Sequence, residues 1–160
     1  MRVARCGLVL MLLACGAPGL RAQTAQDSVR ATVQEFFRTM MARDTAGARR
    51  VLLDDGVTWG MRESDAGFVT WRRTHDQHVA SLGKPGERLL ERMWQPTVQV
   101  HGRLATLWTP YDFHVDGKFS HCGVDAVTLV RTDAGWKIAS FVYTVEPTGC
   151  APSPLGAPGP

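Results

Sequence analysis

The residues best suited to chemistry in this chain lie close together, between Leu104 and Thr144. The candidates for chemistry in this stretch are Trp108, Asp112, His121, Cys122, Asp125 and Tyr143. A buried carboxyl group between aromatic rings resists ionisation, so it can donate a hydrogen bond to a ligand. Asp125 is predicted to be such a group. The alternative is that Asp125 pairs with Tyr143 or His121 and only satisfies the interior of the fold.

His121 is the second candidate, as a catalytic base. Placed opposite Asp112, its imidazole would be oriented by a carboxylate, which is the arrangement that a general base requires. The alternative is a polar pair that faces outward near the end of a hairpin. Cys122 is not expected to be activated by His121, because neighbouring residues of a strand point to opposite faces.

Three antiparallel strands are predicted to position these side chains. Asp116-Gly117 is typical of a two-residue type I′ turn, and Asp133-Ala134-Gly135 offers a three-residue turn. The flanking residues are rich in Val, Thr, Phe, Tyr and Trp, which favour strands. The pairs that follow are Asp112 with His121, Trp108 with Asp125, and Asp125 with Tyr143.

Alternation along these strands predicts two faces. The site face would carry Trp108, Asp112, His121, Asp125, Phe141 and Tyr143. The opposite face would carry Leu107, Tyr111, Phe113, Cys122, Val124, Ala126, Val130, Ile138 and Val142. A single β-bulge would exchange these assignments locally.

Helices and shorter strands are predicted before this run. The predicted elements are helices over 27–43 and 45–53, a strand over 57–62, a helix from 64 or 65 to 81, and a strand over 88–100 that Pro96 interrupts. Helices followed by antiparallel strands indicate an α+β domain.

The predicted third helix offers further cavity residues. Trp71 and His75 fall on its apolar stripe and are expected to reach a pocket, as is Trp59 from the preceding strand. His75 and His78 lie on one helical side, but no third ligand is spaced to complete a zinc site, so neither a metal nor a cofactor is predicted. For the tryptophans and histidines the alternatives are core packing and the polar rim of a helix. Two arginines, Arg62 and Arg92, could bind an acidic group.

The two ends of the chain are predicted to lie outside the domain, which spans residues 23–150. Residues 1–22 are typical of a secretory signal peptide, which predicts export to a periplasmic or extracellular location. Alternatively, Leu12 to Cys15 is a lipobox, and lipidation at Cys15 would tether the domain to a membrane. The Pro/Gly-rich residues 151–160 are predicted to be disordered.

Removal of residues 1–22 changes both the charge and the cysteine count. Lys plus Arg falls from 18 to 15, equal to the 15 Asp plus Glu, so a nucleic-acid partner is not expected. Two cysteines stay, Cys122 and Cys150, and a lone pair in an oxidising compartment is a disulfide candidate. The alternative is two separate thiols.

The order of elements, with "LLDDGV" closing the second helix and "GWKIASFVYT" as the last strand, resembles the nuclear transport factor 2-like superfamily. That superfamily includes SnoaL-like proteins, ketosteroid isomerases and scytalone dehydratases. The segment "VHGRLATLWTPYDFHVDGKFSHCGVDAVTLVRTDAGWKI" is similar to a bacterial family described as lumazine-binding. The resemblance implies a cone-shaped roll: a curved, mostly antiparallel sheet wrapped around the N-terminal helices, with a pocket between them and often a homodimer.

Matching to the ketosteroid isomerases implies that Asp125 stands where those enzymes carry a carboxylic acid that hydrogen-bonds an oxyanion. Phe36 falls at the position of their oxyanion-hole tyrosine, and Gly60 at that of their general base. Their mechanism therefore does not carry over, although the match implies that Asp125 faces the pocket.

Three functions remain open from the sequence. The first is an exported protein that binds a small apolar or planar molecule, anchored by Asp125 and His121. Its further ligand-contacting residues would be Trp59, Trp71, His75, Trp108, Asp112 and Tyr143. The second is a cofactor-free lyase or isomerase with His121 or His75 as base and Asp125 as acid. The third is a dimerisation module with a filled pocket.

Overall fold

The computed structural model describes residues 18–64 and 67–159. The helices and strands are α1 (Pro18–Ala42), α2 (Thr45–Val51), β1 (Leu52–Ser64), β2 (Gly67–Thr74), α3 (His75–Leu82), β3 (Leu89–Met93), β4 (Thr97–His101), β5 (Leu104–Val115), β6 (Lys118–Thr132) and β7 (Gly135–Thr144). Most of the predicted signal peptide, with Cys15, lies outside the described residues, and its last five residues form the start of α1.

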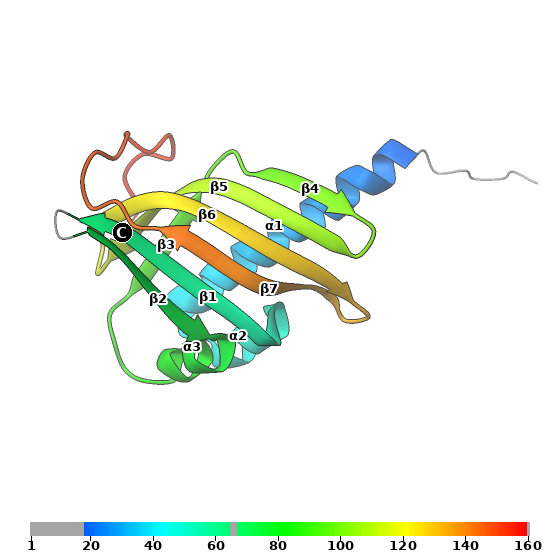
Figure 1. Cartoon of the computed structure of the whole chain (residues 1–160), viewed down its shortest axis with the longest axis horizontal. Helices are drawn as coiled ribbons and strands as arrows, with labels where there is room; N and C mark the ends of the chain where they lie inside the picture. The colour runs from blue at the N-terminus through cyan, green and yellow to red at the C-terminus, as the bar shows by residue number, and fades with distance from the viewer. Residues whose placement is uncertain (1–17, 65–66, 160) are drawn as a thin grey trace, which may run out of the picture.

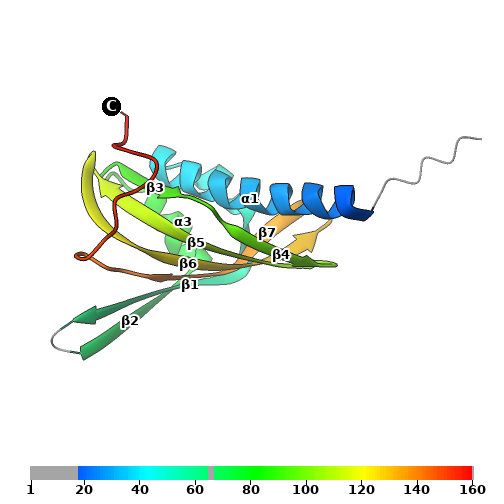
Figure 2. The same ribbon diagram turned by 90° about the horizontal axis from the view of Figure 1, so that it is seen from above.

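One curved sheet and one long helix dominate the architecture (Figures 1 and 2). The sheet has the strand order β2-β1-β7-β6-β5-β3, with β4 also paired to β5. All pairs are antiparallel except β1 with β7, which is parallel. Figure 2 shows α1 lying along one side of the sheet and the β1–β2 hairpin projecting from the body. The predicted α+β roll is therefore confirmed.

The core lies between α1 and the sheet. The buried residues of α1 recur at helical spacing and are Val29, Val33, Phe36, Phe37 and Met40. They pack with buried residues of β5, β6 and β7, such as Leu107, Leu129 and Ile138. The inward face of the sheet is therefore the face that α1 covers.

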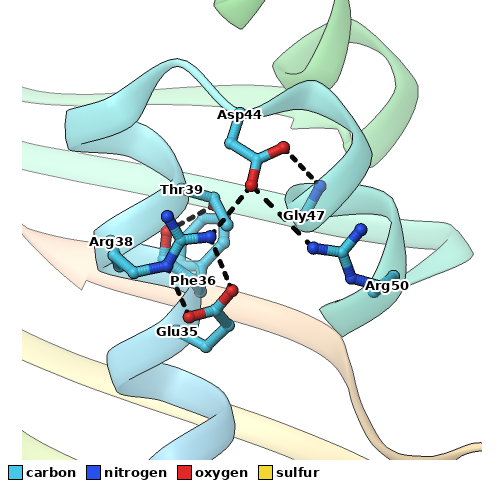
Figure 3. A network of polar contacts seen from close by, with 7 residues as sticks. All are labelled: Glu35, Phe36, Arg38, Thr39, Asp44, Gly47 and Arg50. Carbon is cyan, nitrogen blue, oxygen red and sulfur yellow. Dashed lines mark hydrogen bonds and ion pairs between the residues drawn. The ribbon is translucent and has the colours of Figure 1, made fainter.

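The corner between α1 and α2 is held by a polar network (Figure 3). Asp44 caps α2 by accepting a hydrogen bond from the Gly47 N–H at 2.7 Å. The other Asp44 oxygen accepts one from Arg38 at 2.9 Å, and Arg38 forks onto Glu35. The network is largely exposed, so it fixes the direction of the chain more than it stabilises the fold.

The predicted third helix is wrong over its first half, where residues 67–74 form strand β2. Trp71 is three residues after Phe68, as on one face of a helix, and two after Val69, as on one face of a strand, so the apolar spacing suits both. Pairing with β1 decides for the strand, with Gly60 opposite Trp71. The helix begins only at His75, after Thr74 forms a capping box with Gln77.

The predicted strand over 88–100 is broken into β3 and β4, as Pro96 indicated. The break includes Gln95, which has a φ of 47°. A proline has no N–H to donate to a ladder, so pairing stops there and resumes at Thr97. Both pieces pair with β5.

The β5–β6 hairpin has the predicted turn but a different register further on. Asp116 and Gly117 have φ values of 51° and 76°, as a type I′ turn requires. Ser120 is then an extra residue, because His114 pairs with Phe119 while Phe113 pairs with His121. This bulge places Cys122 opposite Asp112 and Thr109 opposite Asp125. The predicted pairs of Asp112 with His121 and Trp108 with Asp125 are therefore wrong.

The β6–β7 hairpin has the predicted partner for Asp125, although its turn and a later position in β7 differ from the prediction. Thr132 pairs with Gly135, so the turn is one residue shorter than expected. Ala139 is then an extra residue in β7, because Leu129 pairs with Ile138 and Thr128 with Ser140. The two differences cancel, and Asp125 lies opposite Tyr143 as predicted.

A disulfide joins Cys122 to Cys150, as predicted. It follows a backbone bridge in which Cys122 and Glu146 exchange hydrogen bonds. Beyond it, the Gly156 carbonyl accepts a hydrogen bond from Arg92 at 2.9 Å. Within residues 18–64 and 67–159, no helix is long and apolar enough to cross a membrane.

Candidate functional site

A cavity of about 400 Å³ lies between the sheet and the helices. Side chains from α1, α3 and every strand except β4 surround it. The lining residues are Phe36, Met40, Thr58, Arg62, Trp71, Arg73, His78, Leu89, Glu91, Tyr111, Phe113, His121, Phe141, Tyr143 and Val145. A pocket of this size, with aromatic walls and a few polar groups, is typical of a site for a small ligand.

Two carboxyl groups meet at the inner wall of this cavity. Glu91 is part of the lining, and Asp125 is fully buried behind it, close enough for the two acids to influence each other. Within the described part of the chain, neither Asp125 oxygen makes a hydrogen bond of good geometry. Buried polar atoms nearly always have a partner, so this wall can accept a further hydrogen-bonding group.

Both acids hold their protons more tightly than usual. Burial raises the pKa of Glu91 to about 8, and a contact with Asp125 offsets part of this effect. Burial, followed by the nearby Glu91 charge, raises the pKa of Asp125 well above its usual range. Glu91 is therefore mainly protonated at neutral pH, so the pair can donate hydrogen bonds and Glu91 can act as a general acid.

Two tyrosines flank the acid pair, and each depends on a glycine. The Tyr111 hydroxyl donates a hydrogen bond to the Thr144 carbonyl at 2.6 Å, across β6 at Gly123. A Cβ at Gly123 would collide with that carbonyl and with the Tyr111 ring. Burial raises the pKa of Tyr111 above its usual value, so the phenol stays neutral.

The second tyrosine, Tyr143, accepts a hydrogen bond from Trp71 Nε1 at 2.9 Å. The indole lies over Gly60, where any side chain would collide with it. Gly60 stands at the position that the resemblance assigned to a general base, and it carries no side chain. Its missing side chain makes room for a wall of the cavity.

Two histidines line the cavity as neutral bases. His121 stacks on Phe113 with ring centroids 4.9 Å apart, and burial lowers its pKa. His78 packs against Phe36, and burial lowers its pKa to about 4. The buried Nε2 of His78 has no partner among the described residues. Either imidazole can accept a proton or a hydrogen bond.

His75 lies away from this cavity, contrary to the prediction. Its ring is 2% exposed and packs against Gly56, and its Nδ1 lies 2.8 Å from the Leu53 carbonyl. Burial lowers its pKa. Because α3 begins at His75, this residue faces the start of β1 instead of the cavity.

Three more predicted ligand contacts lie on the other face of the sheet. Trp59 and Trp108 are 38% and 58% exposed there, since the inward positions beside them are taken by Thr58 and Thr109. Asp112 is buried on that outer face, where Arg92 forks onto both of its oxygens at 2.8 and 2.6 Å. The Ser120 bulge is the reason that Trp108 and Asp112 were assigned to the wrong face.

The sequence reasoning missed Glu91 and placed Tyr111 and Phe113 on the wrong face. Glu91 is the one acid in the strand "LLERM". The signal for its inward direction was that apolar residues stand two positions before and after it in this strand. Asp125 lies directly behind the lining. The predicted residues that line the cavity are His121, Trp71, Tyr143, Phe141 and Arg62. Outside the gaps at residues 1–17, 65–66 and 160, no three metal-binding side chains cluster.

Comparison with known proteins establishes the fold. The sequence matches no family model, and no curated protein sequence is significantly similar to it. Solved structures do match. A nuclear transport factor 2-like protein of Salmonella enterica has a TM-score of 0.60 at 13% identity, over 81% of this chain and 96% of that one. A protein of unknown function from Mycobacterium tuberculosis has a TM-score of 0.67 at 15% identity, over 83% and 78%.

A third structure, a nuclear transport factor 2-like protein of Novosphingobium aromaticivorans with a cystatin-like fold, has a TM-score of 0.63 at 19% identity, over 83% of this chain and 88% of that one. The chain therefore has the nuclear transport factor 2-like fold. At such identities the likeness concerns the fold alone, and the activity has to be inferred from the cavity.

Proposed function

We propose that this chain is an exported protein that binds a small, largely apolar and planar molecule between its sheet and α1. The observation that carries the proposal is the buried Asp125 carboxyl, which contacts Glu91 but makes no hydrogen bond of good geometry among the described residues. It stands behind Glu91, at the wall of a cavity of about 400 Å³. A ligand with a carbonyl or similar acceptor would accept a hydrogen bond from the protonated Glu91, the member of the pair that lines the cavity.

The lining supports a flat ligand. Aromatic rings from four strands and α1 face the space, and flat rings stack well on such walls. The likeness of residues 100–138 to the bacterial lumazine-binding family agrees with this choice, so a lumazine is one ligand to test. Export is supported by the Cys122–Cys150 disulfide, because such bonds persist in oxidising compartments.

Binding can be measured with N-phenyl-naphthylamine, a neutral planar dye whose fluorescence rises in apolar surroundings. We expect Leu89→Trp to abolish the signal, because Leu89 lines the cavity and the larger side chain would fill it. Leu104→Trp is the matched control, since Leu104 is half exposed and lies outside the lining. Circular dichroism verifies that both variants fold.

Two results would contradict the proposal: no dye binding by the wild type, or equal binding by both variants. Native mass spectrometry of the protein purified from its own host provides an independent test. We expect a bound small molecule that is absent from the Leu89→Trp variant.

A cofactor-free lyase or isomerase is the second candidate, favoured by a protonated Glu91 and a neutral His121 in the lining of the same cavity. In that reaction the imidazole would take a proton from the ligand and Glu91 would return one. Turnover would then rise as His121 loses its proton and fall as Glu91 ionises. A bound ligand that stays chemically unchanged across this range would exclude catalysis.

We also propose that two copies pair through the outer face of the sheet. Trp59, Val142, Ala126 and Trp108 form one row across four strands there, and both tryptophans are exposed. An exposed apolar row of this kind is typical of an interface. Sedimentation of the wild type is expected to show a dimer.

A further inference from the structure

Two arginines, Arg62 and Arg73, line the cavity from the β1–β2 hairpin. Their strand positions alternate with outward residues, so both share the inward face with Trp71, which lies between them. Both are exposed overall, which places them at the mouth of the cavity. The opposite wall holds Glu91, so the cavity has a cationic mouth and an acidic wall.

Neither arginine is neutralised by a carboxylate. In residues 18–64 and 67–159 no ion pair involves Arg62 or Arg73, and the Arg73 guanidinium donates a long hydrogen bond of 3.4 Å to Ser81 Oγ. Arg92 differs, because it is forked onto the buried Asp112. A guanidinium keeps its charge at any pH that a protein tolerates.

The remaining lining does not supply a negative charge. Glu91 is the one acid in it, and burial raises its pKa to about 8, so it is mainly neutral at neutral pH. His78 is neutral as well, and the Arg73 charge is among the causes that lower its pKa. The cavity therefore offers two uncompensated positive charges beside an apolar interior.

We propose that the ligand is an organic anion: a flat apolar body carrying a carboxylate, sulfonate or phosphate that Arg62 and Arg73 bind at the mouth. The rings of Trp71 and Tyr143 hold the body, and its far end reaches the Glu91–Asp125 pair with a hydrogen-bond acceptor. A planar guanidinium fork matches the oxygens of such a group. This inference rests on the proposed function, whose ligand it specifies.

The test compares two dyes that differ in a single group. Anilinonaphthalene sulfonate carries a sulfonate that N-phenyl-naphthylamine lacks, on the same aromatic body. We expect the wild type to bind the sulfonate dye about tenfold more tightly, which is the size of one charge-assisted hydrogen bond. Raising the salt concentration should weaken the sulfonate dye alone, since screening acts on charges.

Variants then locate the charge. Arg62→Gln/Arg73→Gln is expected to remove the tenfold preference, so that the ratio of the two dissociation constants falls to about one. Arg72→Gln is the matched control, because Arg72 lies on the same strand but on the outer face, opposite Trp59. The control should keep the preference although it also loses a positive charge.

The outcomes separate this inference from the proposed function. If neither dye binds, or if Leu89→Trp removes neither signal, the cavity is not a ligand site and both proposals fail. If both dyes bind equally, or if Arg72→Gln loses the preference as fully as the double variant does, the anion proposal is overturned while the binding proposal stands. The anion proposal is also overturned if the double variant still binds the sulfonate dye about tenfold more tightly than the neutral dye.

Discussion

Two neighbouring rows of the same four strands differ sharply in character. The inward row is Gly60, Tyr143, Asp125 and Thr109. The outward row is Trp59, Val142, Ala126 and Trp108. Asp125 is fully buried without a hydrogen bond of good geometry among the described residues, whereas Trp108 is 58% exposed. One step along each strand therefore separates the polar candidate site from an apolar exterior, because side chains alternate between faces.

The inward acids should make stability depend on pH, and this is the largest effect that we expect. The folded pKa of Glu91 is about 8, above its ordinary value, so the folded state holds a proton that the unfolded state releases. The contribution of Glu91 to the free energy of unfolding is then fully present below about pH 5. It falls by about 1.4 kcal/mol per pH unit up to about pH 8. Urea unfolding across this range measures it.

Glu91→Gln should make that decline shallower, because the amide cannot ionise and only the buried Asp125 still loses a proton. Asp133→Asn is the control, since Asp133 is exposed, and it should leave the slope as it is in the wild type. An equal decline in all three proteins would show that the inward acids do not govern stability.

The inward face of the sheet should also resist added volume where the outward face tolerates it. Gly123→Ala places a methyl group against the Thr144 carbonyl and the Tyr111 ring. We expect a loss of about 2–3 kcal/mol in the free energy of unfolding, which is typical of overpacking. Ala126→Val on the outward row should cost less than about 0.5 kcal/mol. Similar losses in the free energy of unfolding for both variants would contradict the proposed difference between the two faces.

A smaller effect is expected from the indole that lies over Gly60. Trp71→Phe keeps an aromatic wall but removes the hydrogen bond to the Tyr143 hydroxyl. The expected cost is about 1 kcal/mol of stability, together with weaker binding of the neutral dye. Trp59→Phe, which alters the outward face, should leave dye binding unchanged. Dye titration measures binding by both variants, and thermal unfolding measures their stability.

The smallest effect on monomer stability belongs to the outward row. Trp108→Ser should change the free energy of unfolding by less than about 0.5 kcal/mol, because the ring is exposed. The same change should shift a dimer toward monomers in sedimentation. A dimer that persists unchanged would mean that this row is not the contact surface.

The sequence predicted the strands and turns better than the faces. Asp116-Gly117 sets the pairing of Val115 with Lys118, because few residues other than these adopt two consecutive left-handed conformations. The bulge at Ser120 has no comparable signal. Serine is common in regular strands and in bulges alike, so the inward placement of Tyr111 and the outward placement of Trp108 could not be derived.

Glu91 shows a second limit. Its strand is short, and its inward direction depends on pairing with β5 and on the break at Gln95. Such pairing between distant segments is a property of the folded chain, and local patterns do not contain it. Asp125 was predictable because the partners that surround it, Tyr143 above all, belong to the adjoining hairpin.

The parallel contact between β1 and β7 has a consequence for how the protein is made. Among the strands of residues 18–64 and 67–159, β7 alone joins the β1–β2 hairpin to the rest of the sheet, and its residue Ile138 pairs with Leu52. A ribosome must therefore release nearly the whole polypeptide before the sheet can become continuous. Contacts so far apart in sequence slow folding. A nascent chain with this connectivity therefore keeps an incomplete sheet until β7 has been made.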